Sequence, residues 1–530
     1  MKAKIFATIM VTTFLVVAMF SVFPVKAAFV GDITIGVIGP TPYPHWTAGY
    51  QPASEMARNE INTAGGVYLS DGPNGAGDYQ IVLKFADEHA GPPPDPDAAA
   101  AATEDLILNK GVDFIIGGFR TECVSEEIEI AMDWDIPFII NGASTTELLS
   151  ETVGNPALYE RYKYVSRVNP MNSTVLPAAV LAFLQWLIPI KFLPLYGHDL
   201  GEGYPQVRVA VISEDLEWAD LIHYILTDPG QYPTYLGPYA KVVYGGRIPE
   251  GATNLNPWLQ DVDDSDARIC IQIFSGVQGP TFTGTWKARV AAGGSKWVPV
   301  GINVYGQMQG YWTLTAGACE YEAFLDTSGT RSPIVPGVTE VFWDNFVAYT
   351  GGLWPLYTAW GAYDGLMGLC ESLEAIGSLD IDDLVAHNED PAYQRMGLTG
   401  LFKYTRCHDM YSPAEVNGPF VHPMGYVRSV VVQWQESGSG AKQVVSPTDA
   451  SYSRRFKIPP WMYPFDTDLD YNGNVNIFDV ATAAAAFGSM PGHPRWDKES
   501  DCALPYGIVN IFDVAKVASE FGSYIPIPLP

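Results

Sequence analysis

Charged residues are scarce in this chain, and basic residues are scarcer still. Only 17% of the 530 residues are charged, and 30 Lys and Arg face 59 Asp and Glu. Because a nucleic-acid-binding surface needs a basic face, we expect no nucleic-acid partner. The apolar content of 47% is too high for an acidic disordered chain. The sequence therefore predicts a globular protein of two or three domains, with either large buried interfaces or a sparsely charged surface.

Cysteine is also rare, and nucleophile motifs are lacking. The six cysteines lie at wide, irregular spacings, and none forms a Cys-x-x-Cys pair, which disfavours zinc sites and thioredoxin-like chemistry. No cysteine precedes Cys123, so the N-terminus lacks the residue that lipid anchoring requires. No Ser-His-Asp arrangement is recognisable, and we expect no enzymatic activity.

The N-terminus has the order of regions that is typical of an export signal. Lys2 and Lys4 precede an apolar run over 5–23, and small residues follow at 27–28. This order predicts a signal peptide over residues 1–28 and an exported protein, whether extracellular, cell-surface or periplasmic. The alternative is an uncleaved N-terminal membrane anchor, because about 19 apolar residues nearly span a bilayer.

From residue 32 onward, short apolar runs alternate with amphipathic stretches. Ile33–Ile38 predicts a buried parallel strand, and helical spacing follows over 52–61. Further strands are expected at 81–85, 114–118, 137–140, 207–212, 269–274 and 297–301, helices at 98–108, 175–188 and 357–376, and closing antiparallel strands at 401–404 and 427–434. The alternation indicates an α/β fold of two lobes, with parallel sheets and helices on both faces.

Five segments of this α/β region form an ordered series. They read ITIGVIGP, MARNEINTAGG, DFIIGGFRTECV, IPFIINGASTTEL and RVAVISEDLEWAD. In order and spacing they resemble the type I periplasmic binding proteins of the leucine/isoleucine/valine class. The resemblance covers roughly 32–447 and implies a two-lobed fold, with crossovers between the lobes near 168, 305–355 and 395. It also implies that a small solute binds between the lobes and passes to an ABC permease.

The resemblance further implies which residues meet the solute. Thr121 matches the hydroxyl that meets an amino acid's α-carboxylate, and Gly142 and Ser144 match polar positions just after the next strand. Trp46 and Trp218 match aromatic walls contributed by the two lobes. Each of these residues lies on a loop just past an expected strand, where a doubly wound sheet binds its ligands.

Asn303 departs from the pattern of the class. It stands where the class uses a carboxylate to hold the solute's ammonium group. Glu122, Glu214 or Asp215 are candidates to replace that carboxylate. The ligand therefore stays open between amino acids, amides, urea-like solutes, sugars and aromatic acids.

A short repeat lies near the C-terminus. The segments VNIFDVATAAAAFGS at 475–489 and VNIFDVAKVASEFGS at 509–523 agree at 11 of 15 positions. Oxygen-bearing residues precede and enter the first copy at the spacing of a calcium loop: Asp468, Asp470, Asn472, Asn474 through its carbonyl, Asn476 and Asp479, with Gly473 at the sharp turn. The second loop has an extra residue and carries Leu504 and Tyr506 near ligand positions, so we expect weak or absent Ca²⁺ there.

A calcium loop followed by one helix, occurring twice, resembles a type I dockerin over about 465–523. The resemblance implies bound Ca²⁺ and a cohesin-bearing partner protein. In that family loop positions ten and eleven help to choose the partner, and here they are Ile477–Phe478 and Ile511–Phe512. These apolar pairs either form a partner surface or pack within the module.

The expected organisation comprises a signal peptide at 1–28, a two-lobed solute-binding domain at 32–447, a linker at 448–464, a small all-α dockerin-like domain at 465–523 and a Pro-rich tail at 524–530. The first functional hypothesis is an extracytoplasmic solute-binding protein that serves an ABC transporter. The alternative is a cohesin-tethered surface receptor or assembly component that binds a ligand without feeding a transporter.

Overall fold

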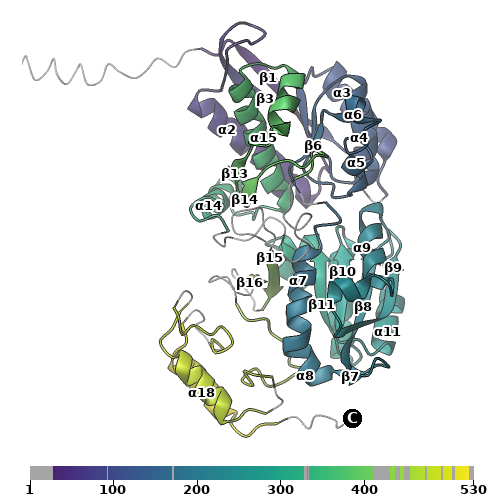
Figure 1. The fold of residues 1–530 in the computed structure, drawn as a ribbon, viewed down its shortest axis with the longest axis vertical. Coiled ribbons are helices and arrows are strands. Elements are labelled where there is room, and N and C mark those ends of the chain that lie inside the picture. Colours follow the sequence, from purple (N-terminus) through teal and green to yellow (C-terminus); the bar gives the residue numbers. More distant parts are fainter. Residues whose placement is uncertain are drawn as a thin grey trace, which may run out of the picture.

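Two α/β lobes and a small helical module make up the molecule (Figure 1). The computed structural model describes residues 28–91, 93–169, 172–326, 331, 334–410, 430–435, 442–446, 454–471, 474–490, 493–503 and 508–524. The expected signal peptide lies outside these residues except for Ala28, as do Asn472, Gly473 and nearly all of the tail. Within the described part of the chain, no helix is long and apolar enough to cross a membrane.

The first lobe is built on a six-stranded sheet of order β2-β3-β1-β4-β5-β6. Its strands are β1 (Gly31–Gly39), β2 (Val67–Leu69), β3 (Gly77–Asp87), β4 (Phe114–Gly117), β5 (Phe138–Ile140) and β6 (Val165–Arg167). All neighbouring pairs are parallel except β2 with β3, which a short turn connects. Helices α2 (Gln51–Ala64), α3 (Pro96–Leu108), α4 (Thr121–Asp133) and α15 (Tyr357–Ile376) belong to this lobe, as the apolar spacing predicts.

The second lobe is built on an eight-stranded mixed sheet of order β16-β15-β12-β11-β10-β8-β7, with β9 also paired to β8. Its strands are β7 (His198–Asp199), β8 (Pro205–Glu214), β9 (Ala240–Ile248), β10 (Ile269–Phe274), β11 (Val298–Asn303), β12 (Ala323–Asp326), β15 (Val430–Trp434) and β16 (Lys442–Ser446). The pairs of β7 with β8, β12 with β15 and β15 with β16 are antiparallel. The antiparallel pairing of β15 with β12 confirms the closing antiparallel strand expected at 427–434, and β7 and β16 are two further antiparallel edge strands.

One expected closing strand lies outside both large sheets. The segment expected at 401–404 forms β14 (Gly400–Phe402), which pairs with β13 (Arg395–Gly397) in a separate two-stranded ribbon. Phe402 and Met410 pack with residues of the first lobe's core, so the chain is still in that lobe at residue 410. The crossover expected near 395 consequently comes later in the chain.

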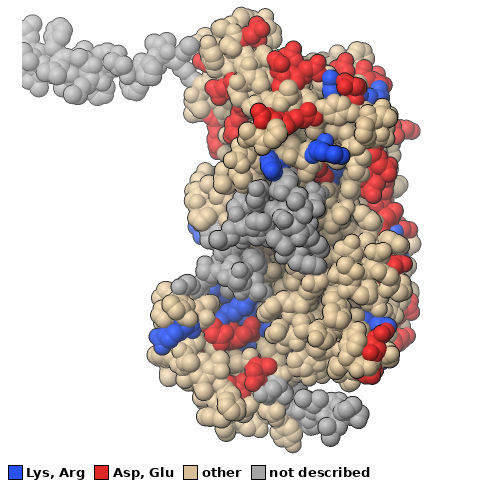
Figure 2. Space-filling view, in the orientation of Figure 1, with Lys and Arg blue, Asp and Glu red and all other residues tan. Residues whose placement is uncertain are grey.

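The remaining helices cover the sheets or join the lobes. They are η1 (Trp46–Tyr50), α5 (Glu147–Ser150), α6 (Tyr159–Tyr162), α7 (Ala178–Leu187), η2 (Ile188–Phe192), α8 (Leu193–Tyr196), α9 (Glu217–Thr227), α10 (Tyr232–Leu236), α11 (Asn256–Asp264), α12 (Gln278–Ala291), η3 (Val304–Gln307), α13 (Tyr311–Leu314), α14 (Thr339–Thr350) and α16 (Ile381–Glu389). Figure 2 shows acidic side chains gathered on the first lobe, whereas the broad front of the second lobe is mainly uncharged. On that face the low charge of the sequence appears as a sparsely charged surface.

The C-terminal module consists of α18 (Ile477–Ala486) and α19 (Ile511–Ser519), one from each copy of the repeat. The two copies exchange backbone hydrogen bonds reciprocally. Gly522 N donates to Val475 O at 2.8 Å, and Gly488 N donates to Val509 O at 2.7 Å. A small core shared by both copies, which includes Leu469 and Val517, holds the helices together.

The described part of the expected linker, 454–464, packs against the second lobe. Phe456 belongs to the large core, and Trp461 lies 5.9 Å from Trp286 and 5.3 Å from Tyr321 between ring centroids. This strap, 454–464, thus packs on the lobe instead of standing free of it. Its apolar side chains are the signal in the sequence that the linker prediction overlooked.

A buried lysine joins the C-terminal module to the second lobe. Lys191 in η2 is fully buried, and its Nζ donates to Phe456 O at 2.9 Å, to Tyr471 Oη at 2.5 Å and to Glu499 Oε2 at 2.8 Å. Arg455 also contacts Glu499, and its Nη1 donates to the backbone carbonyl oxygen of Glu499 at 2.9 Å. All three ammonium donors of Lys191 are thus used within one polar cluster between the module, the strap and the lobe.

We expect Lys191→Met to destabilise this junction strongly. Without the ammonium group, the described ion pair that remains for the largely buried Glu499 carboxylate is the longer 3.6 Å contact to Arg455 Nε, and breaking a buried pair typically costs about 3–5 kcal/mol. Chemical unfolding curves measure the loss, and limited proteolysis shows whether the C-terminal module is released. Lys241→Met is the matched control, because Lys241 pairs with Glu202 at the surface and exposed pairs contribute about 0–1 kcal/mol. Equal stability of the two variants would contradict the anchoring role.

Candidate functional site

A cavity lies between the two lobes, and we call it the interlobe pocket. It is lined by Phe119, Arg120, Thr121, Gly142 and Ser144 from the first lobe, by Trp218, Ser275, Ile302, Val304 and Gln307 from the second, and by Leu176 and Tyr357. Its free volume is about 40 Å³, which is enough for a few water molecules. A solute the size of an amino acid therefore needs the lobes to open or the lining side chains to move.

A glycine pair after β4 turns the chain into the pocket. Gly117 has φ 146° and Gly118 has φ 79°, and a Cβ on Gly117 would lie 1.9 Å from Ile38 O. Only glycine fits this left-handed turn against the neighbouring strand. Thr121 follows at the first position of α4, and its hydroxyl lies 2.5 Å from that of Thr145.

The loop after β5 supplies the neighbouring wall. A Cβ on Gly142 would lie 1.9 Å from Tyr50 Oη and 2.3 Å from Gly118 O, so the two first-lobe loops approach too closely for any side chain there. Tyr357 Oη donates to Gly142 O at 3.1 Å and fixes the loop from α15. Ser144 follows on the same loop and lines the pocket beside Thr121.

The second lobe presents a tryptophan held by a buried carboxylate. Trp218 Nε1 donates to Glu214 Oε1 at 2.6 Å, and Ser275 N donates to the same oxygen at 2.9 Å. Glu214 ends β8 and Ser275 follows β10, so both lie at the carboxyl ends of parallel strands. The indole of Trp218 thereby forms a fixed wall of the pocket.

Arg120 spans the cleft from the first lobe to the second. Its Nη1 donates to Ser275 Oγ at 3.0 Å and lies 3.9 Å from Glu214 Oε1, while its Nη2 lies 3.7 Å from Glu250 Oε1. Because the guanidinium and the Glu214 carboxylate are largely buried, solvent screens this attraction less than at the surface. The contacts therefore hold the lobes together across the pocket.

Four of the six residues expected to bind the solute line one cavity: Thr121, Gly142, Ser144 and Trp218. Trp46 does not line it. Its indole packs in the core, with ring centroids 5.6 Å from Phe85 and 6.4 Å from Tyr50. The aromatic side chains Tyr43 and His45, just before it, face the cleft instead.

Asn303 also lies away from the interlobe pocket. Its Nδ2 donates to Tyr311 Oη and to Glu322 Oε1, both at 2.7 Å, in the interior of the second lobe. Its neighbours Ile302 and Val304 line the pocket, and alternation along the strand turns Asn303 to the other side.

Several lining residues were missed by the sequence reasoning, notably Arg120 and Ser275. Glu214 appeared only as one of three replacement carboxylates. Their place in the chain could have indicated them, because residues that come directly after parallel strands gather at one edge of the sheet. Arg120, which immediately precedes Thr121, meets that criterion.

A buried carboxylate fixes the loop that carries Arg120. Glu88 Oε1 accepts from Phe119 N at 2.9 Å and from Arg120 N at 2.6 Å. Burial raises the pKa of Glu88 to about 8, and burial together with the nearby Glu88 raises that of Glu127 as well. Neither oxygen of Glu127 has a hydrogen-bond partner among the described residues.

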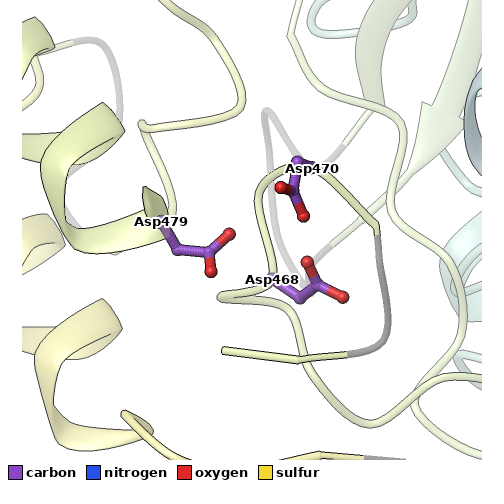
Figure 3. A group of neighbouring side chains, drawn as sticks. All are labelled: Asp468, Asp470 and Asp479. Atoms are coloured by element: carbon purple, nitrogen blue, oxygen red, sulfur yellow. The ribbon is translucent and has the colours of Figure 1, made fainter. Parts of the chain in front are cut away.

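Three aspartates of the expected calcium loop gather beside α18. Carboxylate oxygens of Asp468, Asp470 and Asp479 all lie within 4.8 Å of one another, and Asp468 and Asp479 are buried. In Figure 3 Asp479, at the start of α18, points toward the loop that carries the other two. Hard oxygen donors at this separation suit Ca²⁺, and a cation there would offset the repulsion between buried like charges.

The other expected ligands are placed differently or lie outside the described residues. Asn476 caps α18, with its Oδ1 accepting from Phe478 N at 2.9 Å, and Asn474 is exposed. Asn472 lies outside the described part of the loop. In the second copy Asp513 Oδ1 accepts from Cys502 N at 2.8 Å, as Asp479 Oδ1 does from Leu469 N, but 504–507 are not described.

Comparison with known proteins gives a match over most of the chain. A family model described as periplasmic binding protein matches residues 32–412. The Leu/Ile/Val-binding protein homolog 6 of Brucella melitensis is 22% identical over 273 residues, which are 51% of this chain and 57% of that protein. The homolog of Brucella abortus matches equally. The chain thus spans under two thirds of the length of these curated relatives, and α18 and α19 lie outside the family match.

Solved structures share the fold. A putative branched-chain amino acid ABC transporter protein from Silicibacter pomeroyi has a TM-score of 0.63 at 17% identity, covering 81% of this chain and all of that one. A branched-chain amino acid transporter substrate binding protein from Streptococcus pneumoniae, in complex with isoleucine, has a TM-score of 0.56 at 15% identity, covering 78% and 100%. A solute binding protein from R. palustris, in complex with benzoate, has a TM-score of 0.56 at 14% identity, covering 78% and 94%.

We expect the stability of the protein to fall as pH rises from about 5 to about 8. Burial raises the pKa of Glu88 from 4.5 to about 8, so the folded chain keeps a proton that the unfolded chain releases. Each such group gives a slope of up to about 1.4 kcal/mol per pH unit. Glu88→Gln should flatten the slope, because Gln does not titrate. Its single side-chain oxygen can still accept both backbone N–H groups, so the loop should keep its position. Denaturant unfolding at several pH values measures it.

The control for this pH experiment is Glu126→Gln, on the exposed face of α4. It should leave the slope as in the parent protein. A slope that is the same in all three proteins would show that Glu88 ionises normally in the folded state.

Proposed function

The chain belongs to the periplasmic binding protein family, and on this premise we propose that it captures a small polar solute between its lobes and presents it to an ABC permease. The proposed solute is an amino acid, an amide or a related small acid. The protein binds and releases it without chemical change. An exported location follows from the same proposal.

The observation that carries this proposal is the convergence of both lobes on one pocket. Thr121, Ser144 and Arg120 of the first lobe line the same cavity as Trp218 of the second. Hydroxyl and guanidinium donors suit a carboxylate, and the aromatic wall suits an apolar body. The structures with isoleucine and benzoate hold small carboxylates, which supports a carboxylate-bearing solute for this pocket.

We expect Thr121→Val to weaken solute binding by about tenfold. The substitution removes one hydroxyl donor but keeps the shape, and a hydrogen bond to a charged group contributes about 1.5–3 kcal/mol. A thermal-shift screen of amino acids, amides, aromatic acids and sugars on the parent protein first identifies binders, since binding raises the melting temperature by mass action. Isothermal titration then gives the dissociation constants.

Thr285→Val in α12 is the matched control, because its hydroxyl donates to Thr281 O far from the pocket. It should bind the solute like the parent protein. Absence of any shift with every solute in the screen would overturn the proposed function, and equal loss in both variants would overturn the role of Thr121.

A second candidate function rests on the C-terminal module, for which we propose a calcium-stabilised dockerin-like attachment to a cohesin-bearing protein. Asp468, Asp470 and Asp479 would hold the ion, which would neutralise their repulsion and order the loop. In this second function the protein is a surface receptor, whose cleft binds a ligand without passing it to a transporter.

Exposed apolar side chains support this second candidate. Ile477 and Phe478 are 60% and 71% exposed, and Ile511 and Phe512 are both 61% exposed. The two pairs occupy equivalent first-turn positions of α18 and α19. Apolar side chains that are this exposed favour a partner surface over packing within the module.

We expect removal of calcium with EGTA to increase hydrogen exchange over residues 466–523. Without the cation the buried carboxylates repel one another and the loop loses its central contacts. Helix α3 in the first lobe is the internal control and should exchange at an unchanged rate. Identical exchange of the module with and without EGTA would contradict calcium binding.

A further inference from the structure

A second chamber continues the interlobe pocket on the far side of Arg120. Its free volume is about 30 Å³, and it shares Phe119, Arg120 and Ser275 with the interlobe pocket. Tyr43, His45, Glu250 and Tyr305 are among the residues that line it. The side chain of Arg120 thus divides one cleft into two parts.

Three polar atoms around this chamber have no hydrogen-bond partner among the described residues. They are Nε2 of His45, Nε of Arg120 and Oε1 of Glu250. His45 is only 2% exposed, and Arg120 is 7% exposed. Because buried polar groups are normally hydrogen-bonded, unmatched atoms around a cavity indicate a polar occupant.

The charges around the chamber favour a cation. The carboxylates of Glu214 and Glu250 face the single guanidinium of Arg120. Burial, with a smaller contribution from Arg120, lowers the pKa of His45 to about 3, so its ring is neutral. The ring of His45 lies 4.2 Å from that of Phe119 and 5.8 Å from that of Tyr305. A carboxylate beside aromatic rings is a suitable site for an ammonium group.

We propose that the solute is an ω-amino carboxylate, whose carboxylate lies against Thr121 and Ser144 and whose distant ammonium group reaches Glu250 in the second chamber. The assignment rests on the proposed solute-binding function. Arg120 lines both chambers, and its buried Nε–H has no hydrogen-bond partner among the described residues. An α-amino acid, with both charges on adjacent carbons, would leave the second chamber unfilled.

The test compares hexanoate, 2-aminohexanoate and 6-aminohexanoate by isothermal titration on the full chain with calcium. We expect 6-aminohexanoate to bind about tenfold or more tighter than each of the other two. In Glu250→Gln the ratio between the affinities for 6-aminohexanoate and hexanoate should fall toward one. Glu202→Gln, which changes a surface carboxylate of the same lobe, should keep the parent ratio.

Two results would overturn the second chamber as an ammonium site. The first is that hexanoate or 2-aminohexanoate binds more tightly than 6-aminohexanoate and that Glu250→Gln leaves the ratio of the affinities for 6-aminohexanoate and hexanoate unchanged. This result would exclude the ammonium site but would still support the solute-binding function. Absence of binding by all three acids would also exclude the ammonium site. The solute-binding function falls as well only if the wider thermal-shift screen is negative.

Discussion

The carboxyl ends of the parallel strands in both sheets face the same cleft, and this constraint determines the composition of the site. Thr121 and Ser144 follow β4 and β5, while Glu214 ends β8 and Ser275 follows β10. Their loops meet only because both lobes direct the same strand ends inward. The pocket is therefore formed by residues of both lobes together.

Electrostatics within the cleft reinforce this geometry. Glu88 fixes the backbone of Phe119 and Arg120, and Arg120 in turn reaches Glu214 of the other lobe. In the proposed function, an entering solute would replace or share these contacts, and they would select its charges. At the opposite end of the second lobe, Lys191 fixes the strap and the C-terminal module to the same scaffold. The module is thus a structural neighbour of the lobe and is not loosely tethered to it.

Periodicity predicted most of the fold because buried strands and amphipathic helices leave strong patterns, and α15 begins and ends where its pattern does. The packed strap depends on long-range contacts that no local pattern records. In the site, Thr121 and Trp218 were found through the resemblance, whereas the side chain of Asn303 contacts Tyr311 and Glu322 inside the second lobe and does not line the pocket. Arg120 was missed because its contacts with Glu214, Glu250 and Ser275 depend on how the second lobe lies against the first.

The most direct test of the account is a crystal structure of the protein with the tightest-binding solute from the screen. We expect the solute between the lobes, with its carboxylate within hydrogen-bond distance of the Thr121 hydroxyl and its body against Trp218. A solute bound elsewhere, or one that contacts only a single lobe, would contradict it.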